Sequence, residues 1–475
     1  MPTPPQPLEV KRAEVEFHRF AALGESEKTR AVYAERNRSR SGLIRKHLDW
    51  LAPITPFLEI GAGPGHTSYL LVNEFGAEGF ALDLSADALR QGAELARHFD
   101  WPRSPMKVAG DALRLPFHDG SLRTVFTFQT LSQFLDIEPV IVEVKRVLAP
   151  GGVFFFAEEP IRRLLSLQLY RCPYPEWMMP WERKLYAWGL LPYLVRDVIG
   201  AAQEESFGIR QNHSMTLKRW HRLLEKHFPS RRYEIFLNEQ GAFDGLVRHL
   251  AVRLDRHHSI WLAARLLGGT LAAVCRKEGQ PPPSWADPRE NLARYLRCPD
   301  CTGSLSLNGD GSLCCACGYT APCQEGVYDL LPSADRTELY PGAREDILDF
   351  SRPGHENALL EGWGPVEGIG ANCYRWIGAR ATARLIAARP GPCKLRLRGF
   401  VAPRAIELHR RMRVEIRANG HRAGRWTLRR PGLFVLEARL PAAPEYIVEI
   451  LAEPVWTAPP DLRPLTVNIG LLRLL

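Results

Sequence analysis

Three closely spaced glycines and one carboxylate stand in the stretch LEIGAGPGH, which runs from Leu58 to His66. An apolar run precedes the glycines and an apolar-periodic run follows them, so the stretch is predicted to be a strand, a turn and the start of a helix. A dinucleotide-binding loop needs glycine at its sixth position, where this chain has His66. Glu59 would repel a pyrophosphate, whereas it could accept hydrogen bonds from a cationic ligand. The loop therefore favours a nucleoside that carries positive charge, with an ordinary strand, turn and helix as the alternative.

Two further carboxylates follow at the ends of later apolar runs. Asp83 closes the run that begins at Gly79, roughly 20 residues after the loop, which is where such folds place the acid that binds ribose hydroxyls. Asp111 closes the next run, which begins at Lys107, and its carboxylate could face an exocyclic amine. The three acids together predict a nucleoside site.

The elements that must position these acids alternate between strand-like and helix-like segments. After the first three strand-like runs, residues 124–128 and 153–157 read as a fourth and a fifth strand. Such alternation predicts right-handed crossovers, a parallel sheet and a ligand site at the carboxyl ends of the strands.

These residues, in this order, resemble the class I S-adenosylmethionine-dependent methyltransferases over about residues 30 to 277. The family's turn before strand four is matched by Leu115–Ser121 and its turn before strand five by Val147–Gly152. Many relatives carry a pair of histidines after strand four, where this chain has residues 129–133, QTLSQ, which weakens the case for a histidine base there. The resemblance implies S-adenosylmethionine as the cofactor, bound by Glu59, Gly61, Gly63, Gly65, Asp83, Leu84, Asp111, Ala112 and Gln129.

The general base, if the reaction needs one, is expected at the end of the fifth strand. Glu158 and Glu159 stand there, and either could accept a proton from an oxygen nucleophile. Each carboxylate could instead cap a helix or pair with Arg162 or Arg163. The following insert, residues 160–259, is rich in aromatic residues and prolines. It is predicted to form the acceptor pocket, with packing as core the alternative, since large aromatic side chains are more often core than pocket.

Length and composition describe ordinary globular material. The 475 residues predict two to four domains, and 45% hydrophobic with 24% charged residues is typical of folded proteins. The formal net charge of +9 is compatible with anionic partners. No signal peptide or membrane span is evident, so a cytoplasmic protein is expected; the basic residues Arg253, Arg256, His257 and His258 keep contact with a membrane surface as a minority interpretation.

Four of the ten cysteines have metal-ligand spacing. Cys298, Cys301, Cys314 and Cys317 form the pattern Cys-x2-Cys-x12-Cys-x2-Cys, which predicts a closed, tetrahedral structural zinc site rather than disulfides. Cys315 lies next to the third ligand, but a one-residue spacer to Cys317 suits a tetrahedral site poorly. Zinc thiolates agree with a reducing cytoplasm, and a segment this short needs the metal to fold.

The segment Leu296–Pro332 resembles the small zinc-ribbon proteins that activate tRNA and protein methyltransferases, through both cysteine pairs and the closing residues 325–332, EGVYDLLP. The resemblance implies a stabilising role, here by docking within the same chain. A simple spacer is the alternative.

The remaining residues, from Glu361 onward, read as short strands, with a hairpin signal at Asn419-Gly420. Residues 394–398, KLRLR, alternate strictly, which predicts that Leu395 and Leu397 face inward and the cations outward. The region predicts a β-sandwich and resembles a jelly-roll-like module fused to bacterial glycosyltransferases and other surface-polysaccharide enzymes. The whole chain is thus expected to be α/β, with a Rossmann-like methyltransferase sheet covered by helices on both faces, a small zinc ribbon and an all-β sandwich. Its parts are an extension (1–29), the methyltransferase domain (30–278), a linker (279–295), the ribbon (296–332), a linker (333–360) and the sandwich (361–475).

Three functions agree with these features. The first is methyl transfer to a carbohydrate or polysaccharide-linked acceptor, with the β-domain binding or positioning glycan. The second is methylation of RNA or protein, which the ribbon and the basic charge suggest but no recognition motif supports. The third is a non-catalytic scaffold that keeps the nucleoside pocket.

Overall fold

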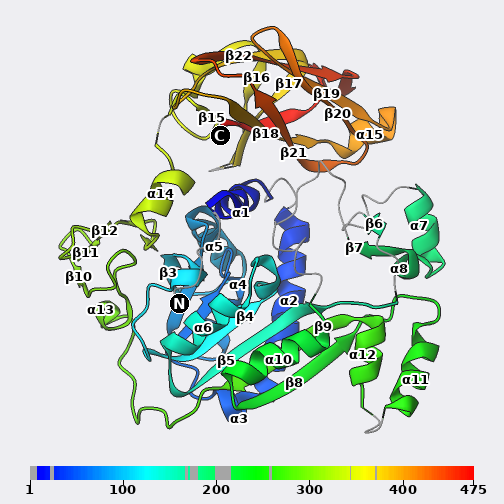
Figure 1. The fold of residues 1–475 in the computed structure, drawn as a ribbon. Coiled ribbons are helices and arrows are strands. Elements are labelled where there is room, and N and C mark those ends of the chain that lie inside the picture. The colour runs from blue at the N-terminus through cyan, green and yellow to red at the C-terminus, as the bar shows by residue number, and fades with distance from the viewer. Residues whose placement is uncertain are drawn as a thin grey trace. The chain divides into compact units, whose positions relative to one another are not determined.

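The computed structural model describes residues 8–21, 26–165, 169–171, 180–197, 215–255, 259–342, 344–369 and 372–475 (Figure 1). The chain forms two compact units. The first unit comprises Met1–His18, Gly24–Ser166 and Ser206–Tyr340; the second comprises Arg19–Leu23, Leu167–Glu205 and Pro341–Leu475. The basic residues 256–258 of the sequence analysis lie outside the described residues.

The first unit is built on one nine-stranded sheet, in the order β13-β14-β3-β2-β1-β4-β5-β9-β8. Strands β1 to β5 are parallel, as predicted, while β9 and β8 run antiparallel to their neighbours. The carboxyl ends of the parallel strands therefore lie at the same edge of the sheet, which is where the alternating sequence pattern predicts a ligand site. The strands are β1 (Phe57–Ile60), β2 (Gly79–Asp83), β3 (Met106–Ala109), β4 (Leu122–Phe128), β5 (Leu148–Ile161), β8 (Ser230–Leu237) and β9 (Gly269–Arg276).

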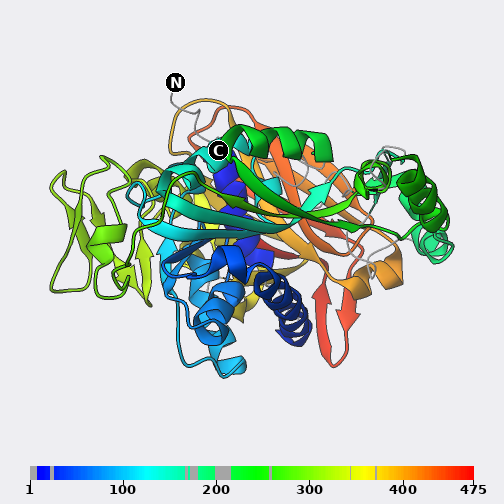
Figure 2. The same cartoon turned by 90° about the horizontal axis from the view of Figure 1, so that it is seen from below.

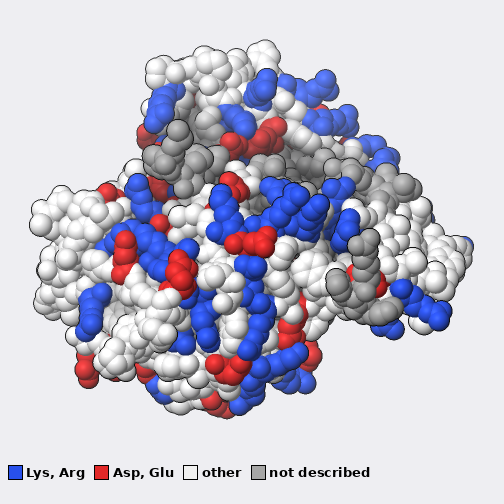
Figure 3. All heavy atoms as spheres, turned by 60° about the horizontal axis from the view of Figure 1, so that its bottom comes forward, with Lys and Arg blue, Asp and Glu red and all other residues white. Residues whose placement is uncertain are grey.

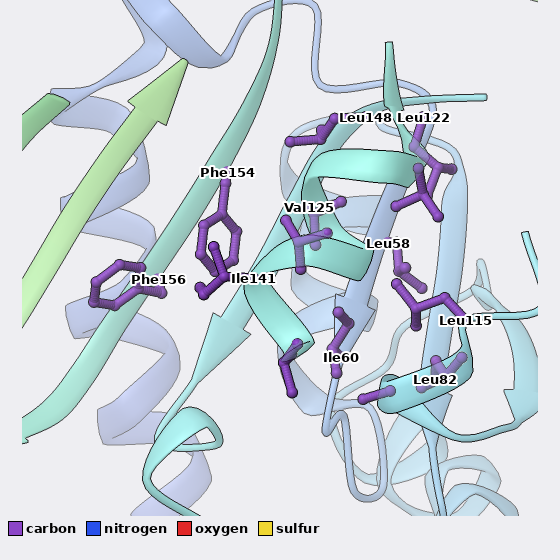
Figure 4. Packing of buried hydrophobic residues seen from close by; sticks show 14 of the residues in the cluster. Leu58, Ile60, Leu82, Leu115, Leu122, Val125, Ile141, Leu148, Phe154 and Phe156 are labelled. Atoms are coloured by element: carbon purple, nitrogen blue, oxygen red, sulfur yellow. The ribbon is translucent and has the colours of Figure 1, made fainter. Parts of the chain in front are cut away.

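Helices cover both faces of this sheet (Figure 2). Side chains of a strand alternate between the faces, so Leu58 and Ile60 pack on the face covered by α6 (Glu138–Val147) and α10 (Leu217–His227), as Figure 4 shows around Ile141 of α6. Phe57 packs on the opposite face, which is covered by the helices α2 (Ser26–Lys46), α3 (Leu48–Leu51) and α4 (His66–Glu74). The other helices of the first unit include α1 (Leu8–Ala21), α5 (Ala86–His98), α11 (Asp244–Leu254), α12 (Trp261–Leu267), α13 (Leu292–Tyr295) and α14 (Ser333–Leu339).

The segment predicted as a separate ribbon contributes to the methyltransferase sheet. Strand β14 (Val327–Asp329) pairs in parallel with β3 and brings β13 (Cys323–Gln324) with it. The amino-terminal part forms its own three-stranded sheet of β10 (Leu305–Leu307), β11 (Leu313–Cys315) and β12 (Thr320–Ala321). Leu305 and Cys298 belong to the same buried cluster as Leu58 and Phe80. The two parts therefore share one hydrophobic core.

The second unit contains one antiparallel sheet of nine strands, which confirms the all-β expectation. Its path is β20-β19-β22-β17-β25-β18-β21, with β15 on β25 and β16 on β17. The end strands β20 and β21 also lie against each other, so the sheet curls around a single core. The β-domain is therefore one curled antiparallel sheet, and its classification as a sandwich stays a prediction. The strands are β15 (Ile347–Asp349), β16 (Leu359–Ile369), β17 (Asn372–Ile386), β18 (Cys393–Val401), β19 (Met412–Ala418), β20 (His421–Leu428), β21 (Gly432–Leu440), β22 (Glu445–Glu453) and β25 (Asn468–Leu474).

Local predictions in this unit have mixed outcomes. Asn419 and Gly420 have φ of +49° and +81° between β19 and β20, which confirms the hairpin. Leu395 and Leu397 are buried as predicted, but Arg398 is also buried, so the expectation that all cations of that strand face outward is wrong. Side chains on both faces of the strand are buried at Arg398, and the alternation of apolar and charged residues in the sequence does not indicate burial on both faces. The unit also contains α7 (Pro180–Ala187), α8 (Leu191–Leu194), α15 (Pro403–His409), and the paired strands β23 (Trp456–Ala458) with β24 (Asp461–Leu465) and β6 (Leu169–Arg171) with β7 (Val195–Asp197).

No helix within the described ranges has both the length and the apolar character needed to span a membrane.

Candidate active site

The glycine loop follows β1 and enters α4. Gly61, Gly63 and Gly65 all have positive φ, between +54° and +83°, a backbone region that favours glycine. A Cβ on Gly61 would collide with the side chain of Thr130, whereas a Cβ on Gly63 would meet no atom within 4 Å. The backbone is thus tightly packed at Gly61 and open at Gly63, as a loop that lets a ligand approach its backbone requires.

Asp83, at the end of β2, fixes this loop. Its Oδ2 accepts a hydrogen bond from the Gly63 N–H at 2.8 Å and its Oδ1 accepts one from the Ser85 N–H at 2.8 Å. The side chain lines a cavity at the carboxyl edge of the sheet. Each carboxylate oxygen has a second lone pair, so the same group remains able to accept ribose hydroxyls.

The cavity collects five of the nine predicted cofactor residues: Gly61, Asp83, Leu84, Asp111 and Ala112. Gly63 and Gly65 belong to the loop beside it but do not line it. Glu59 lies behind the loop, where it accepts a hydrogen bond from Ser68 Oγ and where burial raises its pKa to about 7. Its expected contact with the cofactor therefore stays a prediction.

Helix α1 forms part of the cavity wall, which the sequence analysis did not foresee. Glu14 and Val15 line the cavity, and Lys11 Nζ lies 2.8 Å from Asp111 Oδ2 and 2.6 Å from Asp335 Oδ2. Burial lowers the pKa of Lys11, but the two carboxylates outweigh it and the pKa is raised. The sequence predicts only an extension for residues 1–29, because α1 carries no motif; the alternation of charged and apolar residues in α1 is the signal that indicates packing.

Two residues at the sheet's carboxyl edge hold unusual backbone conformations. Gln129 after β4 has φ of +54° and Glu158 in β5 has φ of +65°, and such non-glycine conformations cost about 1–3 kcal/mol each and cluster at functional sites. Gln129 does not line the cavity, but its N–H donates to the Ala157 carbonyl at 3.0 Å. Glu158 receives two hydrogen bonds from Arg40, at 2.7 and 2.6 Å. The Arg40 guanidinium, itself buried, therefore fixes the orientation of the Glu158 carboxylate.

Glu159 has a different environment. It is fully buried, and its carboxylate accepts hydrogen bonds from the N–H groups of Thr130, Leu131 and Ser132 at 2.7 to 2.9 Å. Burial raises its pKa to about 7, against the opposing effect of these donors. Glu159 thus holds the loop after β4 and is closed to solvent, and its expected role as a base stays a prediction.

His66, which stands where a dinucleotide-binding loop would have glycine, lies next to Arg40. His66 Nδ1 lies 2.7 Å from Asn37 Oδ1, and the Tyr33 ring stacks on the imidazole at 4.4 Å. Burial, followed by the nearby Arg40 and Arg36 charges, lowers the pKa of His66 well below its usual value. The ring is therefore neutral and supports the Arg40–Glu158 pair from behind.

The predicted metal ligands come together with one exchange. The thiols of Cys298, Cys301, Cys315 and Cys317 lie within 4.8 Å of one another, whereas Cys314 Sγ donates to Asn308 Oδ1 at 3.1 Å. Neighbouring residues of a strand point to opposite faces, and Cys315, paired with Leu305 in β10, is the one on the inner face. The structure therefore places Cys315, and not Cys314, in the cluster, and the role of Cys314 as a ligand stays a prediction.

The spacing of these thiols suits a tetrahedral ion. Cys298 and Cys317 have their sulfurs 3.7 Å apart, and Cys301 and Cys315 have theirs 3.4 Å apart. Four thiolates at 2.3 Å from one zinc would be about 3.8 Å from each other. The four cysteines thus form a candidate metal site.

Comparison with known proteins agrees with this geometry. Residues 58–156 match the family model described as a methyltransferase domain. The chain is 28% identical over 156 residues to a ubiquinone/menaquinone biosynthesis C-methyltransferase of Cereibacter sphaeroides, covering 31% of this chain and 55% of that protein. It is 27% identical over 132 residues to a chloroplastic tocopherol O-methyltransferase of Arabidopsis thaliana, covering 28% and 36%.

Among solved structures, phosphoethanolamine N-methyltransferase 2 of Haemonchus contortus, in complex with S-adenosyl-L-methionine, is 16% identical with a TM-score of 0.30, covering 49% of this chain and 52% of that one. This likeness is too distant to carry an argument. The chain spans about half the length of the first curated relatives it matches. The fold and these matches together define a class I S-adenosylmethionine-dependent methyltransferase domain.

Replacing Asp83 tests the cofactor site. We expect Asp83→Ala to lower the affinity for S-adenosylmethionine at least 30-fold, because hydrogen bonds to a charged group contribute about 1.5–3 kcal/mol and the glycine loop loses its anchor. Isothermal titration calorimetry measures the affinity. Glu94→Gln, on the exposed surface of α5, is the control; equal binding by both variants would contradict the assignment.

Replacing Glu159 tests its structural task. In Glu159→Gln, an amide NH2 would face backbone donors and leave at least one N–H unpaired, at a cost of about 1–3 kcal/mol. We expect a lower melting temperature in scanning calorimetry, with Glu94→Gln unchanged. An unchanged melt combined with lost turnover would instead return Glu159 to a catalytic role.

Proposed function

We propose that this protein is an S-adenosylmethionine-dependent methyltransferase that acts on a carbohydrate or polysaccharide-linked acceptor. The observation that carries the proposal concerns the insert after β5: its described residues 169–171 and 180–197 group with the β-domain in the second unit. Within that unit, the buried Glu182 of α7 binds Arg430 at 3.0 Å. Inserts at this place in the sheet usually contribute to the acceptor pocket. Because this insert groups with the β-domain, we infer that both contribute to binding the acceptor.

The chemistry follows from the site. Bound S-adenosylmethionine supplies a methyl group that is already activated. The glycine loop and Asp83 would hold it, and in-line positioning of the nucleophile can contribute on the order of 7–11 kcal/mol. For an oxygen acceptor, Glu158 would take the proton, with Arg40 fixing its carboxylate. Relatives named as O-methyltransferases, such as the tocopherol enzyme, support an oxygen acceptor.

We further propose that Cys298, Cys301, Cys315 and Cys317 bind a structural zinc ion. All four ligand positions are cysteines, so the site would be closed and not catalytic. Because the same segment supplies β14 to the methyltransferase sheet, the metal would stabilise that sheet's edge. This is the docking role that the resemblance to methyltransferase activators implies.

RNA or protein methylation is the second candidate, since the net charge is +9. On the face drawn in Figure 3, however, Lys and Arg lie in several groups with Asp and Glu among them. An interspersed distribution suits a nucleic-acid backbone less well than a continuous basic surface would. The third candidate is a scaffold that does not catalyse methyl transfer. It gives no reason for the strained backbone at Glu158, a feature that clusters at functional sites.

Label transfer tests the acceptor class. We expect methyl-tritiated S-adenosylmethionine to label the glycan or lipid-linked pool of fractionated bacterial extract, with no label from Asp83→Ala. Label in RNA or protein would favour the second candidate. Bound cofactor without any transfer would favour the scaffold.

Replacing Glu158 tests the base. We expect Glu158→Gln to keep the melting temperature and to slow methyl transfer about 10²- to 10⁴-fold, with a flattened pH profile. Glu94→Gln again serves as the control, and normal turnover by Glu158→Gln would rule this role out.

The cysteines give a matched pair for the metal. We expect Cys315→Ser to lose zinc, measured by mass spectrometry, and to lower the melting temperature of the first unit. Cys314→Ser should retain both. The opposite outcome would restore the ligand set read from the sequence.

A further inference from the structure

A second cavity lies wholly within the second unit, with a volume of about 310 Å³. Its walls come from β15, from the turn that follows it and from the end of β17. Ligand pockets commonly have about 300–1,000 Å³, so this space suits a ligand the size of one or two sugar rings. Nothing in the methyltransferase chemistry uses it.

Three arginines of the cavity wall already form ion pairs with carboxylates. Arg344 binds Asp346 through two hydrogen bonds of 2.8 and 2.6 Å, and Arg384 binds Glu445 through two of 2.8 Å. Arg352 binds Asp349 at 2.9 Å. Such paired charges leave little net attraction for an anion. Of the three carboxylates only Asp349 lines the cavity itself, so the Arg352–Asp349 pair places N–H donors and carboxylate acceptors side by side in its wall.

The rest of the cavity wall consists of apolar residues and of a histidine that is fixed by hydrogen bonds. Ile347, Ile386 and Pro353 supply apolar surface. His355 Nδ1 lies 2.7 Å from the Arg352 carbonyl oxygen, and its Nε2 lies 3.0 Å from the Arg375 guanidinium and 3.2 Å from a Glu356 carboxylate oxygen. These contacts hold the imidazole in place beside the turn.

We propose that this cavity binds a neutral carbohydrate. Vicinal hydroxyls both donate and accept, so one diol can bridge the Asp349 carboxylate and the Arg352 guanidinium, while Arg344 and Arg384 offer further N–H donors. The apolar residues fit the C–H face of a sugar ring. This inference rests on the proposed function insofar as the bound glycan belongs to the acceptor, but the binding itself requires no methyl transfer.

Two variants of the cavity have a matched control on the same strand. Arg384→Met removes one wall guanidinium, and Ala358→Trp fills the space. Arg380→Met is the control, because Arg380 also lies on β17, has an exposed fraction of 52% against 48% for Arg384, and also binds a glutamate of β22 without lining the cavity.

The experiment measures binding of the full-length protein to an array of neutral, uronic-acid and sulfated oligosaccharides. We expect neutral oligosaccharides to bind, with binding at least tenfold weaker for Arg384→Met and for Ala358→Trp and unchanged for Arg380→Met. Melting curves show that each variant is folded.

Absence of neutral-glycan binding, equal binding by all variants, or salt-sensitive binding of sulfated oligosaccharides alone would overturn the inference. Methyl transfer is measured separately. Glycan binding without label transfer would defeat the proposed function and leave this site standing, whereas transfer without binding would do the reverse.

Discussion

The buried carboxylate of Glu159 is the interaction on which the active edge of the sheet depends. It accepts three consecutive backbone N–H groups, of residues 130–132, after β4. Thr130 in turn packs against Gly61 so closely that no side chain fits there. One carboxylate thus ties the end of β5, the loop after β4 and the glycine loop together. Backbone N–H groups that are buried without a partner would be costly, which explains why an acid stands at a position with no access to solvent.

This constraint also separates the tasks of two adjacent glutamates. Successive side chains of a strand point to opposite sides, and the positive φ of Glu158 turns its carboxylate toward Arg40. Glu159 organises the loop from behind, while Glu158 is held, partly exposed, by a fixed guanidinium. The neutral His66 completes the support, because a charged imidazole beside Arg40 would repel it. Rigid positioning of this kind is what methyl transfer from an activated donor requires.

The first unit also shows how a small metal-binding segment can become part of a larger fold. Strand β14 covers the edge of β3, which would otherwise present unpaired backbone groups. Helix α14 follows, and its Asp335 holds Lys11 of α1 beside Asp111. The cysteine cluster, the sheet edge and the cavity wall are therefore linked by continuous chain and direct contacts. Segments more than 300 residues apart, such as α1 and α14, meet at the cofactor site.

The sequence by itself determined the features that depend on local spacing. The glycine loop, the acids at the ends of β2 and β3, the alternating strands, the hairpin at Asn419 and three of the four clustered cysteines could all be read from it, because each is fixed by residues within a few positions or by the period of a strand. Tertiary structure decided the rest. Cys315 rather than Cys314 joins the cluster because of which face of β11 turns inward. Glu159 and Arg398 are buried because of the elements that pack over them. Helix α1 contributes to the cavity wall because its Lys11 meets Asp111, which lies 100 residues away in the chain. Contacts between distant segments leave no local pattern, so only the folded chain reveals them.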